Sequence, residues 1–421
     1  MLAEQAWMRT CAPAIAGTAH SIPPCLLSDQ QHSVIDLEKA HRVALMVTPD
    51  AKGDVIDQAW EAVSTIRAVL KQQPGAMTVT TQTVFLRRAE DEVVCRRLFE
   101  AYFGQRMPAT SYIVQPPCGG QSLAIEAWAL GGNNVDIEFM APNVVTATYD
   151  GLRWIHLAGI VSPHDVASSY QQSEYVFAEM ARRLRMAKAS FRDVIRTWLY
   201  TGNITEVEGG IERYRELNRA RTEFFEAEHA EGRMPSGPGG EIRYPASTGI
   251  GMRSSSIDIG CLALQTERPD TRIVTLENPG QTAAFDYDAS FSIKSPKFSR
   301  AMAAVIGDYV TTWISGTASI IDSESVHLGD AAQQTEQTID NIQNLIAAEN
   351  FARHGVLGAG AELADLAKVR VYVKRAEDYE VCRAVCERRF GSLPTIYAQA
   401  DVCRPELLVE IEGVAFSRCT S

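Results

Sequence analysis

The sequence predicts an α+β protein made of three related units in tandem, and three observations support this. A short proline motif occurs three times, as Met107-Pro108-Ala109-Thr110, Tyr244-Pro245-Ala246-Ser247 and Leu393-Pro394-Thr395-Ile396. A stretch with helical periodicity precedes each motif, and a strand with alternating apolar residues follows it. The motifs recur at roughly 140 residues, which is too long for a solenoid repeat and suits a small domain. We therefore expect an irregular lead-in over 1–30 and three units over 31–142, 143–297 (with a joining segment at its end) and 298–421.

The first unit has the order βαβαββ. Its first helix carries apolar residues at helical spacing, and the strand that follows is rich in threonine and valine. The predicted elements are strands at 41–47, 77–86, 111–114 and 123–130 and helices at 55–70 and 90–103.

The second and third units repeat this order. Asp150-Gly151 is a strong signal for a hairpin turn between strands. Each predicted helix has one apolar stripe, so we expect mixed sheets with two helices on one face. For the second unit we predict strands at 144–149, 154–160, 193–200 and 256–265, helices at 170–186 and 211–229, a loop at 232–240 and a joining segment at 266–297. For the third unit we predict strands at 309–314, 366–373 and 407–416 and helices at 331–347 and 378–390.

Composition disfavours several classes of protein. A formal net charge of −12 does not supply the basic surface that nucleic-acid binding requires. Nine cysteines without a CxxC pair disfavour structural zinc and a disulfide framework, and Cys382 and Cys386, one helical turn apart, have no matching histidine pair. His156, His164 and His327 show no metal-ligand spacing, so we expect structural roles for them and no metal. Neither a signal peptide nor a membrane span is expected, and a cytoplasmic location fits best.

The chain resembles the RidA/YjgF superfamily. Its closing strand, Glu410-Ile411-Glu412-Gly413-Val414-Ala415, matches the end of that family's domain, and Ala124-Ile125-Glu126-Ala127-Trp128-Ala129 does so in the first unit. Over about 143–419 the chain is similar to one branch, the chorismatases. The segments that carry this likeness are 245–251, Glu277-Asn278-Pro279, Phe298-Ser299-Arg300-Ala301, 314–319 and 403–413.

The resemblance implies a fold and a place for the active site. Members of the superfamily are homotrimers of a small α+β, chorismate-mutase-like domain, with active sites in the clefts between subunits. Three such units in one chain imply an intramolecular pseudo-trimer, because linking them removes the entropy loss of association while still burying the apolar sheet faces. We expect a monomeric pseudo-trimer or a homodimer.

The closing strand of the third unit carries two carboxylates. Alternation places Leu408, Glu410 and Glu412 on one face of the strand, with Leu407, Val409 and Ile411 on the other. One interpretation is that arginines hold both carboxylates in a salt network between units. The other makes Glu410 a general acid whose pKa is raised by burial and by its neighbour, which is the role this position has in the superfamily.

The other two units differ at the position of Glu410. The first unit has Ala124, which cannot transfer a proton, and the second has Asp258, whose side chain is one methylene shorter. The cleft of Glu410 is therefore the predicted active site, and Asp258 is a weaker candidate for a second one.

A second comparison concerns the residue after the Pro-Ala motif. The imine deaminases of the superfamily carry an arginine there that holds the substrate carboxylate, whereas this chain has Thr110, Ser247 and Ile396. None of these can form a bidentate pair with a carboxylate, although Arg243 could compensate. The sequence thus disfavours 2-aminoacrylate deamination.

Chorismate carries two carboxylates, so its pocket needs at least two cationic or amide-rich anchors. Ser315-Gly316-Thr317 follows a predicted strand, and its backbone N–H groups at a tight turn suit an oxyanion or a carboxylate. The alternative is that it is only the turn that ends the strand. Gly249 and Gly251 flank a second predicted turn, which lacks the strand and helix of a dinucleotide-binding fingerprint. Cys403 is a further candidate to line the pocket, although it is expected to be a poor nucleophile. The candidate arginines are Arg253, Arg404, Arg219 and Arg221, each of which has a surface or ion-pair role as its alternative.

These observations lead to three functional hypotheses. The first is hydrolysis of the enolpyruvyl ether of chorismate, or a related carboxylate, without a cofactor, giving pyruvate and a dihydroxycyclohexadiene carboxylate or hydroxybenzoate. The second is an enamine or imine hydrolase with a bulkier substrate, which would release ammonia. The third is a non-catalytic member that binds small molecules in its clefts. None of the three involves nucleic acid or a membrane.

Overall fold

A computed structural model describes residues 26–28, 31–163, 166, 168–237, 239–287 and 294–419. The predicted lead-in lies almost wholly outside these ranges, and the part within them forms a strand, β1. His164 also lies outside the described residues.

The first sheet has six strands in the order β1-β2-β3-β6-β4-β5. Neighbouring strands are antiparallel except β4 and β5, which run parallel because a helix carries the chain back between them. Two helices, α1 and α2, pack on one face of this sheet. The elements are β1 Leu26–Ser28, β2 His32–Asp36, β3 His41–Val47, α1 Val55–Lys71, β4 Met77–Leu86, α2 Asp91–Phe103, β5 Ala109–Ile113 and β6 Leu123–Gly131.

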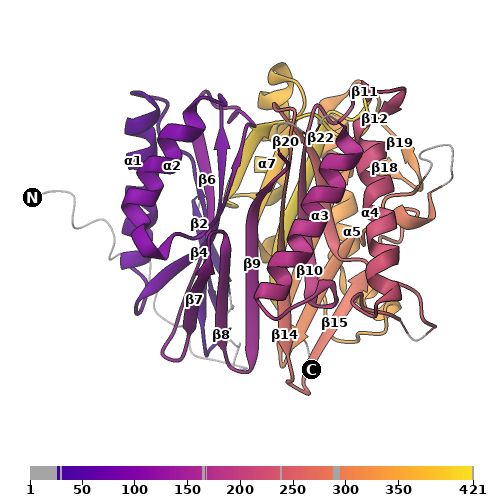
Figure 1. Ribbon diagram of the computed structural model, residues 1–421, viewed down its shortest axis with the longest axis horizontal. Coiled ribbons are helices and arrows are strands. Elements are labelled where there is room, and N and C mark those ends of the chain that lie inside the picture. The colour runs from indigo at the N-terminus through magenta and orange to yellow at the C-terminus, as the bar shows by residue number, and fades with distance from the viewer. Residues whose placement is uncertain are drawn as a thin grey trace, which may run out of the picture.

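The second sheet has the order β13-β10-β14-β9-β8-β7, with β10 and β13 parallel. Helices α3 and α4 cover one face (Figure 1). A two-stranded sheet, β11 with β12, precedes α4. The elements are β7 Asp136–Ala141, β8 Val144–Tyr149, β9 Leu152–Val161, α3 Ser169–Met186, β10 Val194–Gly202, β11 Val207–Glu208, β12 Ile211–Glu212, α4 Arg213–Ala230, β13 Ala246–Met252 and β14 Ile257–Thr266.

The third sheet has the order β15-β16-β17-β22-β20-β21, with β20 and β21 parallel. A second two-stranded sheet, β18 with β19, follows β17. The elements are β15 Thr271–Leu276, β16 Ala301–Ile306, β17 Tyr309–Ala318, β18 Ile320–Ile321, β19 Glu324–Ser325, α5 Ala331–Ile346, α6 Ala348–Arg353, β20 Leu366–Val373, α7 Tyr379–Phe390, β21 Thr395–Gln399 and β22 Val409–Arg418.

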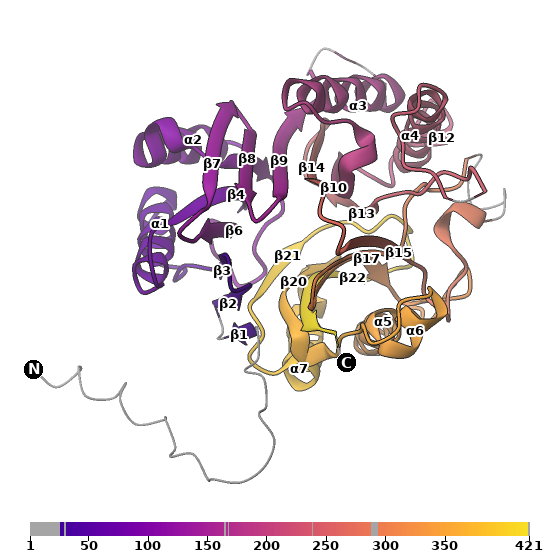
Figure 2. The same cartoon turned by 90° about the horizontal axis from the view of Figure 1, so that it is seen from below.

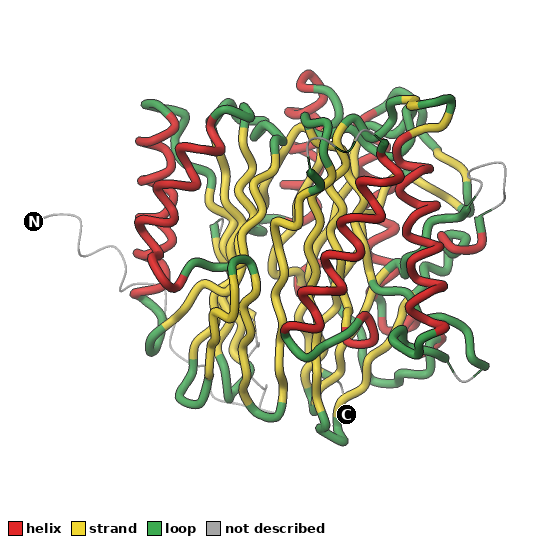
Figure 3. Tube along the Cα trace, in the orientation of Figure 1, coloured by secondary structure: helices red, strands yellow, loops and turns green. Residues whose placement is uncertain are grey.

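The large sheets therefore share one topology, and their strands run side by side along the molecule (Figure 3). Seen from below, the sheets surround a common centre and the helices lie outside them (Figure 2). The last strand of the parallel pair in each sheet lies against another sheet: β5 against β9, β13 against β17 and β21 against β3. Apolar side chains from all three sheets fill the centre, where the rings of Trp154 and Trp313 are 5.7 Å apart.

Local sequence explains where several helices begin. Asp54 caps α1 by accepting hydrogen bonds from the N–H groups of Ile56 and Asp57, and Asp330 accepts one from the N–H of Gln333 at the start of α5. Both helices bury one apolar stripe against their sheets, as their spacing predicts. Among the described residues, no helix combines the length and apolar character needed to cross a membrane.

The structure corrects four details of the sequence prediction. Strand β7 was placed in the first unit, but it pairs with β8 in the second sheet. The joining segment contains β15, which pairs with β16 in the third sheet. Both are edge strands, whose weak patterns resemble loops.

The two predicted turns are also parts of strands. Gly249 and Gly251 lie within β13, which pairs with β10 throughout. Ser315-Gly316-Thr317 lies within β17, where the register with β22 shifts between Ile314 and Thr317. This shift is a β-bulge, which bends the strand and re-aims its backbone groups.

Candidate active site

A cavity of about 250 Å³ lies between the second and third sheets. The two sheets contribute opposite walls to it: α4 and β13 from one side, and β17 and β22 from the other. The small two-stranded sheets contribute Glu212, Ile320 and Glu324. The cavity is lined by Glu212, Tyr214, Arg215, Asn218, Arg221, Ser247, Gly249, Tyr287, Pro296, Phe298, Arg300, Gly316, Ala318, Ile320, Glu324, Cys403, Arg404, Pro405, Glu406, Leu407 and Glu410.

Glu410 is the buried acid of this cavity. It lies on β22 and is only 4% exposed. Burial, and then the like charge of Glu412, raise the pKa of Glu410 to about 8, against the lowering effect of Arg196 and Arg300. Its carboxyl group lies over the bulge of β17, because a Cβ added to Gly316 would be 2.0 Å from Glu410 Oε1. Glycine at 316 is what leaves room for the acid.

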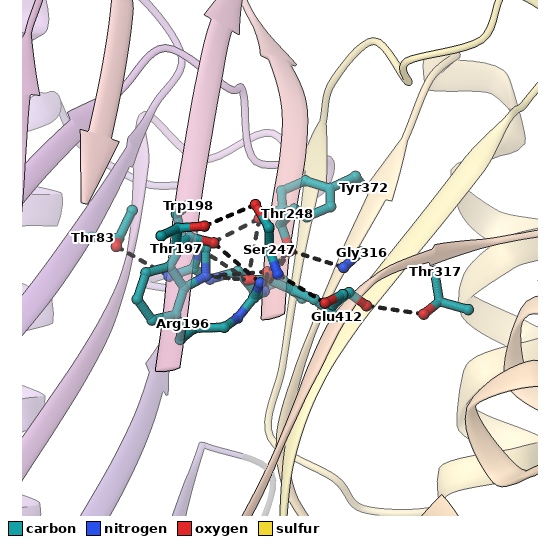
Figure 4. A network of polar contacts seen from close by, with 12 residues as sticks. Thr83, Arg196, Thr197, Trp198, Ser247, Thr248, Gly316, Thr317, Tyr372 and Glu412 are labelled. Atoms are coloured by element: carbon teal, nitrogen blue, oxygen red, sulfur yellow. Dashed lines mark hydrogen bonds and ion pairs between the residues drawn. The ribbon is translucent and has the colours of Figure 1, made fainter. Parts of the chain in front are cut away.

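Glu412, two residues along the same strand, is held quite differently. Arg196 of the second sheet and Arg370 of the third form ion pairs with it, the latter at 3.0 Å. Trp198 Nε1 donates to the same carboxylate at 3.1 Å, and the Thr248 hydroxyl donates to it as well (Figure 4). Burial opposes its ionisation, but the two guanidinium groups outweigh burial and lower the pKa of Glu412 to about 2.

The two interpretations of the paired carboxylates therefore divide between the two residues. Arginines hold Glu412 in a buried network between sheets, as the first interpretation predicted for both. Glu410 faces the cavity with a raised pKa, as the second requires. The network also reaches the first sheet, because Lys368 Nζ lies 3.2 Å from Glu126 and Arg370 binds the same carboxylate.

Several cationic side chains line the cavity. Arg221 and Arg300 are almost fully buried, and each has an Nε atom without a hydrogen-bond partner among the described residues. Arg221 donates to Asn218 Oδ1 at 2.5 Å, and Arg300 donates to the Tyr287 hydroxyl at 2.5 Å. Arg404 donates to the carbonyl of Ser323 at 2.8 Å. Buried guanidinium groups that bond to neutral partners leave their positive charge available to an anionic ligand.

Several predicted site residues line this cavity. They are Glu410, Arg221, Arg404, Gly249, Gly316 and Cys403. Burial raises the pKa of Cys403 to about 12, which keeps it a thiol and agrees with its poor nucleophilicity.

The remaining predicted residues lie elsewhere, for reasons that the packing makes plain. Arg219 is two residues from Arg221, which places it on the opposite face of α4, where it pairs with Glu216 at 2.8 Å and covers Tyr170. Arg253 is exposed and donates to Gln399 at 2.6 Å.

Three of the others stabilise the strands around the cavity. The Ser315 hydroxyl donates to the carbonyl of Ser299 at 2.6 Å, and the Thr317 hydroxyl donates to the carbonyl of Ser315 at 2.9 Å. The N–H of Gly251 donates to the carbonyl of Asp401 at 2.8 Å. Glu412 likewise lies behind the cavity wall, in the network described above.

Some lining residues were not predicted. Tyr214 and Asn218 share a face of α4 with Arg221, at a spacing of four and three residues that the sequence could have revealed as a polar stripe. Arg300 lies immediately before β16, and its signal in the sequence was its place in Phe298-Ser299-Arg300-Ala301, one of the segments similar to the chorismatases.

At the equivalent junction between the first and second sheets, Asp258 stands in the strand position of Glu410. Burial raises the pKa of Asp258 to about 7, and the Ser111 hydroxyl donates to it at 3.1 Å. Tyr112 occupies the place in its proline motif that Gly249 has in the second motif, four residues after the proline. The bulky, buried Tyr112 ring thus lies where glycine leaves space in the other cleft.

No cluster of three or more histidine, cysteine, aspartate or glutamate side chains suited to a metal ion occurs in the described part of the chain.

Comparisons with known proteins fit this geometry. Residues 143–263 match the family model "Chorismatase FkbO/Hyg5-like, N-terminal", and 293–417 match "Endoribonuclease L-PSP". The chain is 33% identical over 276 residues to a 3-hydroxybenzoate synthase of Streptomyces hygroscopicus, which covers 64% of this chain and 76% of that protein.

Two further proteins are similar to the chain. The chain is 36% identical over 228 residues to a chorismatase of Streptomyces rapamycinicus, covering 53% of this chain and 64% of that protein, slightly under two thirds of its length. A chorismatase crystal structure aligns with a TM-score of 0.63 and 22% identity, covering 90% of this chain and 100% of the other, and this likeness bears on the fold.

Proposed function

The chain belongs to the FkbO/Hyg5-like chorismatase family, and from this premise we propose that it cleaves the enolpyruvyl ether of chorismate. The products are pyruvate and either a dihydroxycyclohexadiene carboxylate or a hydroxybenzoate. One observation carries the proposal. A buried carboxyl group with a pKa of about 8, that of Glu410, faces a cavity whose wall holds Arg221, Arg300 and Arg404.

Glu410 is the general acid in this mechanism. Its protonated carboxyl group transfers a proton to the terminal methylene of the vinyl group, and the neighbouring ether carbon becomes oxocarbenium-like. Water adds to that carbon and returns a proton to the Glu410 carboxylate. The hemiketal then breaks the bond between its central carbon and the ring oxygen, its hydroxyl proton passes to that oxygen, and pyruvate leaves. The diene product keeps the ring oxygen as a hydroxyl group; loss of one water from the ring gives the hydroxybenzoate instead.

The arginines position the substrate. Chorismate has two carboxylates, and the buried guanidinium groups of Arg221 and Arg300 have N–H groups that no described residue accepts. Arg404 lies on the same cavity wall. When both carboxylates are held, the vinyl group lies against Glu410. Proton transfer then takes place within one bound complex and needs no separate encounter between acid and substrate.

Burial, helped by the charge of Glu412, keeps the acid protonated. Glu412 remains ionised between Arg196 and Arg370, so its negative charge disfavours ionisation of Glu410 two residues away. A pair of carboxyl groups with separated pKa values is a recurrent way to obtain a neutral acid near pH 7.

We also propose that the three sheets, with their helices, are RidA-like units that form an intramolecular pseudo-trimer. Their common strand order and the cyclic contacts of β5, β13 and β21 support this arrangement. A monomeric or homodimeric state and a cytoplasmic location accompany the proposal. Light scattering on the purified protein tests the oligomeric state.

The function is tested by incubating the protein with chorismate, measuring pyruvate with a coupled assay and identifying the ring product by mass spectrometry. We expect pyruvate from the wild type and from Asp258→Asn, which alters the equivalent position in the other cleft. Glu410→Gln should reduce the rate by about 10²- to 10⁴-fold, as expected for loss of a general acid. A wild type that releases no pyruvate, or a Glu410→Gln variant as fast as the wild type, would overturn the proposal.

A further inference from the structure

A second cavity lies on the common centre of the three sheets, away from Glu410. We call it the axial cavity. It has a volume of about 70 Å³ and receives side chains from all three sheets, among them Arg42 of β3, His156 of β9 and Trp313 of β17. A wider pocket of about 320 Å³ lies next to it at the hairpin turns, and Arg42 lines both spaces while Trp154 lines the wider pocket.

Arg42 is a buried cation without an anionic partner. It is 9% exposed and lines both the axial cavity and the wider pocket. Its guanidinium group stacks on Trp154, 4.2 Å from the ring centroid, and makes no hydrogen bond or ion pair with any described residue. A guanidinium group has five N–H donors, and those of Arg42 remain available to a ligand or to solvent.

Two neutral donors face the same space. His156 and Trp313 line the axial cavity, and no hydrogen bond joins either side chain to another described residue. Burial and the nearby charge of Arg42 lower the pKa of His156 to about 3, so its ring is neutral and offers one N–H.

Nearby acids do not neutralise Arg42. Glu126 also lines the axial cavity, but it is held by Lys368 at 3.2 Å and by Arg370. Glu412 is bound by Arg196 and Arg370. At the position that corresponds to these two glutamates the second sheet has Gly260, which supplies no carboxylate. The cations Arg42, Arg196, Lys368 and Arg370 thus outnumber Glu126 and Glu412 at the centre, whereas the acids Glu38, Asp150 and Asp308 line the wider pocket.

We propose that the axial cavity is a binding site for a small monovalent anion, held against the guanidinium group of Arg42. The volume accommodates a halide with one water molecule or a formate-sized carboxylate, since a water molecule occupies about 30 Å³ in the liquid. The anion accepts hydrogen bonds from Arg42 and from the neutral donors His156 and Trp313. It thereby joins all three sheets and stabilises the folded state, because it binds only when they are assembled.

The test uses the full-length protein in two measurements. The first is thermal unfolding against sodium chloride or sodium formate, at an ionic strength kept constant with sodium gluconate, whose anion is too large for the axial cavity. We expect a saturating rise in Tm of about 1 to 3 °C with chloride and formate. The rise should vanish in Arg42→Met, which keeps an apolar stem on Trp154, and persist in Arg106→Met, which removes an exposed guanidinium that stacks on Phe139.

The second measurement is anomalous diffraction from bromide-soaked crystals of the wild type, which needs no variant to fold. We expect a bromide peak within hydrogen-bonding distance of Arg42. A response to formate without one to chloride or bromide would also support the site and would assign it to carboxylates. Water alone in the axial cavity, with a Tm that responds to neither anion, would overturn the proposal, as would bromide confined to the Glu410 cavity.

Discussion

Replacing Glu412 with glutamine should move the pH dependence of catalysis. The proposed reaction needs Glu410 in its protonated form, which is present below its pKa of about 8 and lost as the pH rises through that value. The wild-type rate should therefore fall above about pH 8. Glu412→Gln removes the adjacent negative charge and leaves Arg196 and Arg370 without their shared anion, and both changes favour ionisation of Glu410.

The magnitude follows from strand geometry. Residues two apart on a strand are separated by about 6.6 Å. Two unit charges at that distance interact by about 2.5 kcal/mol at an effective dielectric constant of about 20. Since 1.36 kcal/mol corresponds to one pH unit, the falling limb should move to lower pH by about 1 to 2 units.

The assay is the initial rate of pyruvate release from chorismate between pH 5 and pH 10, analysed as kcat and kcat/KM. The matched control is Glu406→Gln, which removes a carboxylate from the exposed rim of the same cavity, where solvent screens its charge. Because Glu412→Gln leaves the buried Arg196 without its ion-pair partner and Arg370 with Glu126 alone, we expect about 3 to 5 kcal/mol of destabilisation, and the rates must be taken well below its Tm. A folded, active Glu412→Gln enzyme whose falling limb coincides with that of the wild type would refute the reasoning.

Three further predictions follow from the same geometry. Relative to Glu410→Gln, the wild type should lose about 1.4 kcal/mol of unfolding free energy per pH unit between about pH 5 and pH 8, because the raised pKa of Glu410 makes its ionisation unfavourable in the folded state. Urea unfolding measures this, and the same pH dependence of unfolding free energy in both proteins would contradict it. Gly316→Ala should lower kcat by about 10²-fold with little change in Tm, since the new Cβ would meet Glu410 Oε1 at 2.0 Å and displace the acid; an unchanged kcat would show that the carboxyl group is not held there. Arg221→Met should raise KM for chorismate at least 10-fold while Arg219→Met, on the opposite face of α4, should leave it unchanged; equal effects would remove Arg221 from the substrate site.

The repeated motifs and local periodicity predicted most of the secondary structure. Alternation along the closing strand placed Glu410 and Glu412 on one face, and both are buried there. The same rule failed just before the strand. Because β22 begins at Val409, Leu408 packs into the core of the third sheet with Val409, and Leu407 packs between the sheets.

Long-range features could not be predicted from local pattern. Arg196 and Glu412 are 216 residues apart in the chain, and their contact depends on how β10 and β22 pack across the cleft. The bulge in β17 is equally hidden, since Ser315-Gly316-Thr317 has the composition of a turn and becomes a strand only by pairing with β22. Whether an arginine such as Arg219 or Arg221 reaches the cavity depends on the rotation of one helix, which a single sequence does not specify.

The most direct test of this account is the protonation state of Glu410 itself. Infrared difference spectra between the wild type and Glu410→Gln, recorded from pH 6 to pH 10, isolate the carbonyl stretch of a protonated carboxylic acid at this position. We predict that the band is present at pH 7 and disappears with a midpoint near pH 8. Its absence at pH 7, with the carboxylate bands in its place, would mean that the enzyme has no neutral acid in the cleft and would contradict the account.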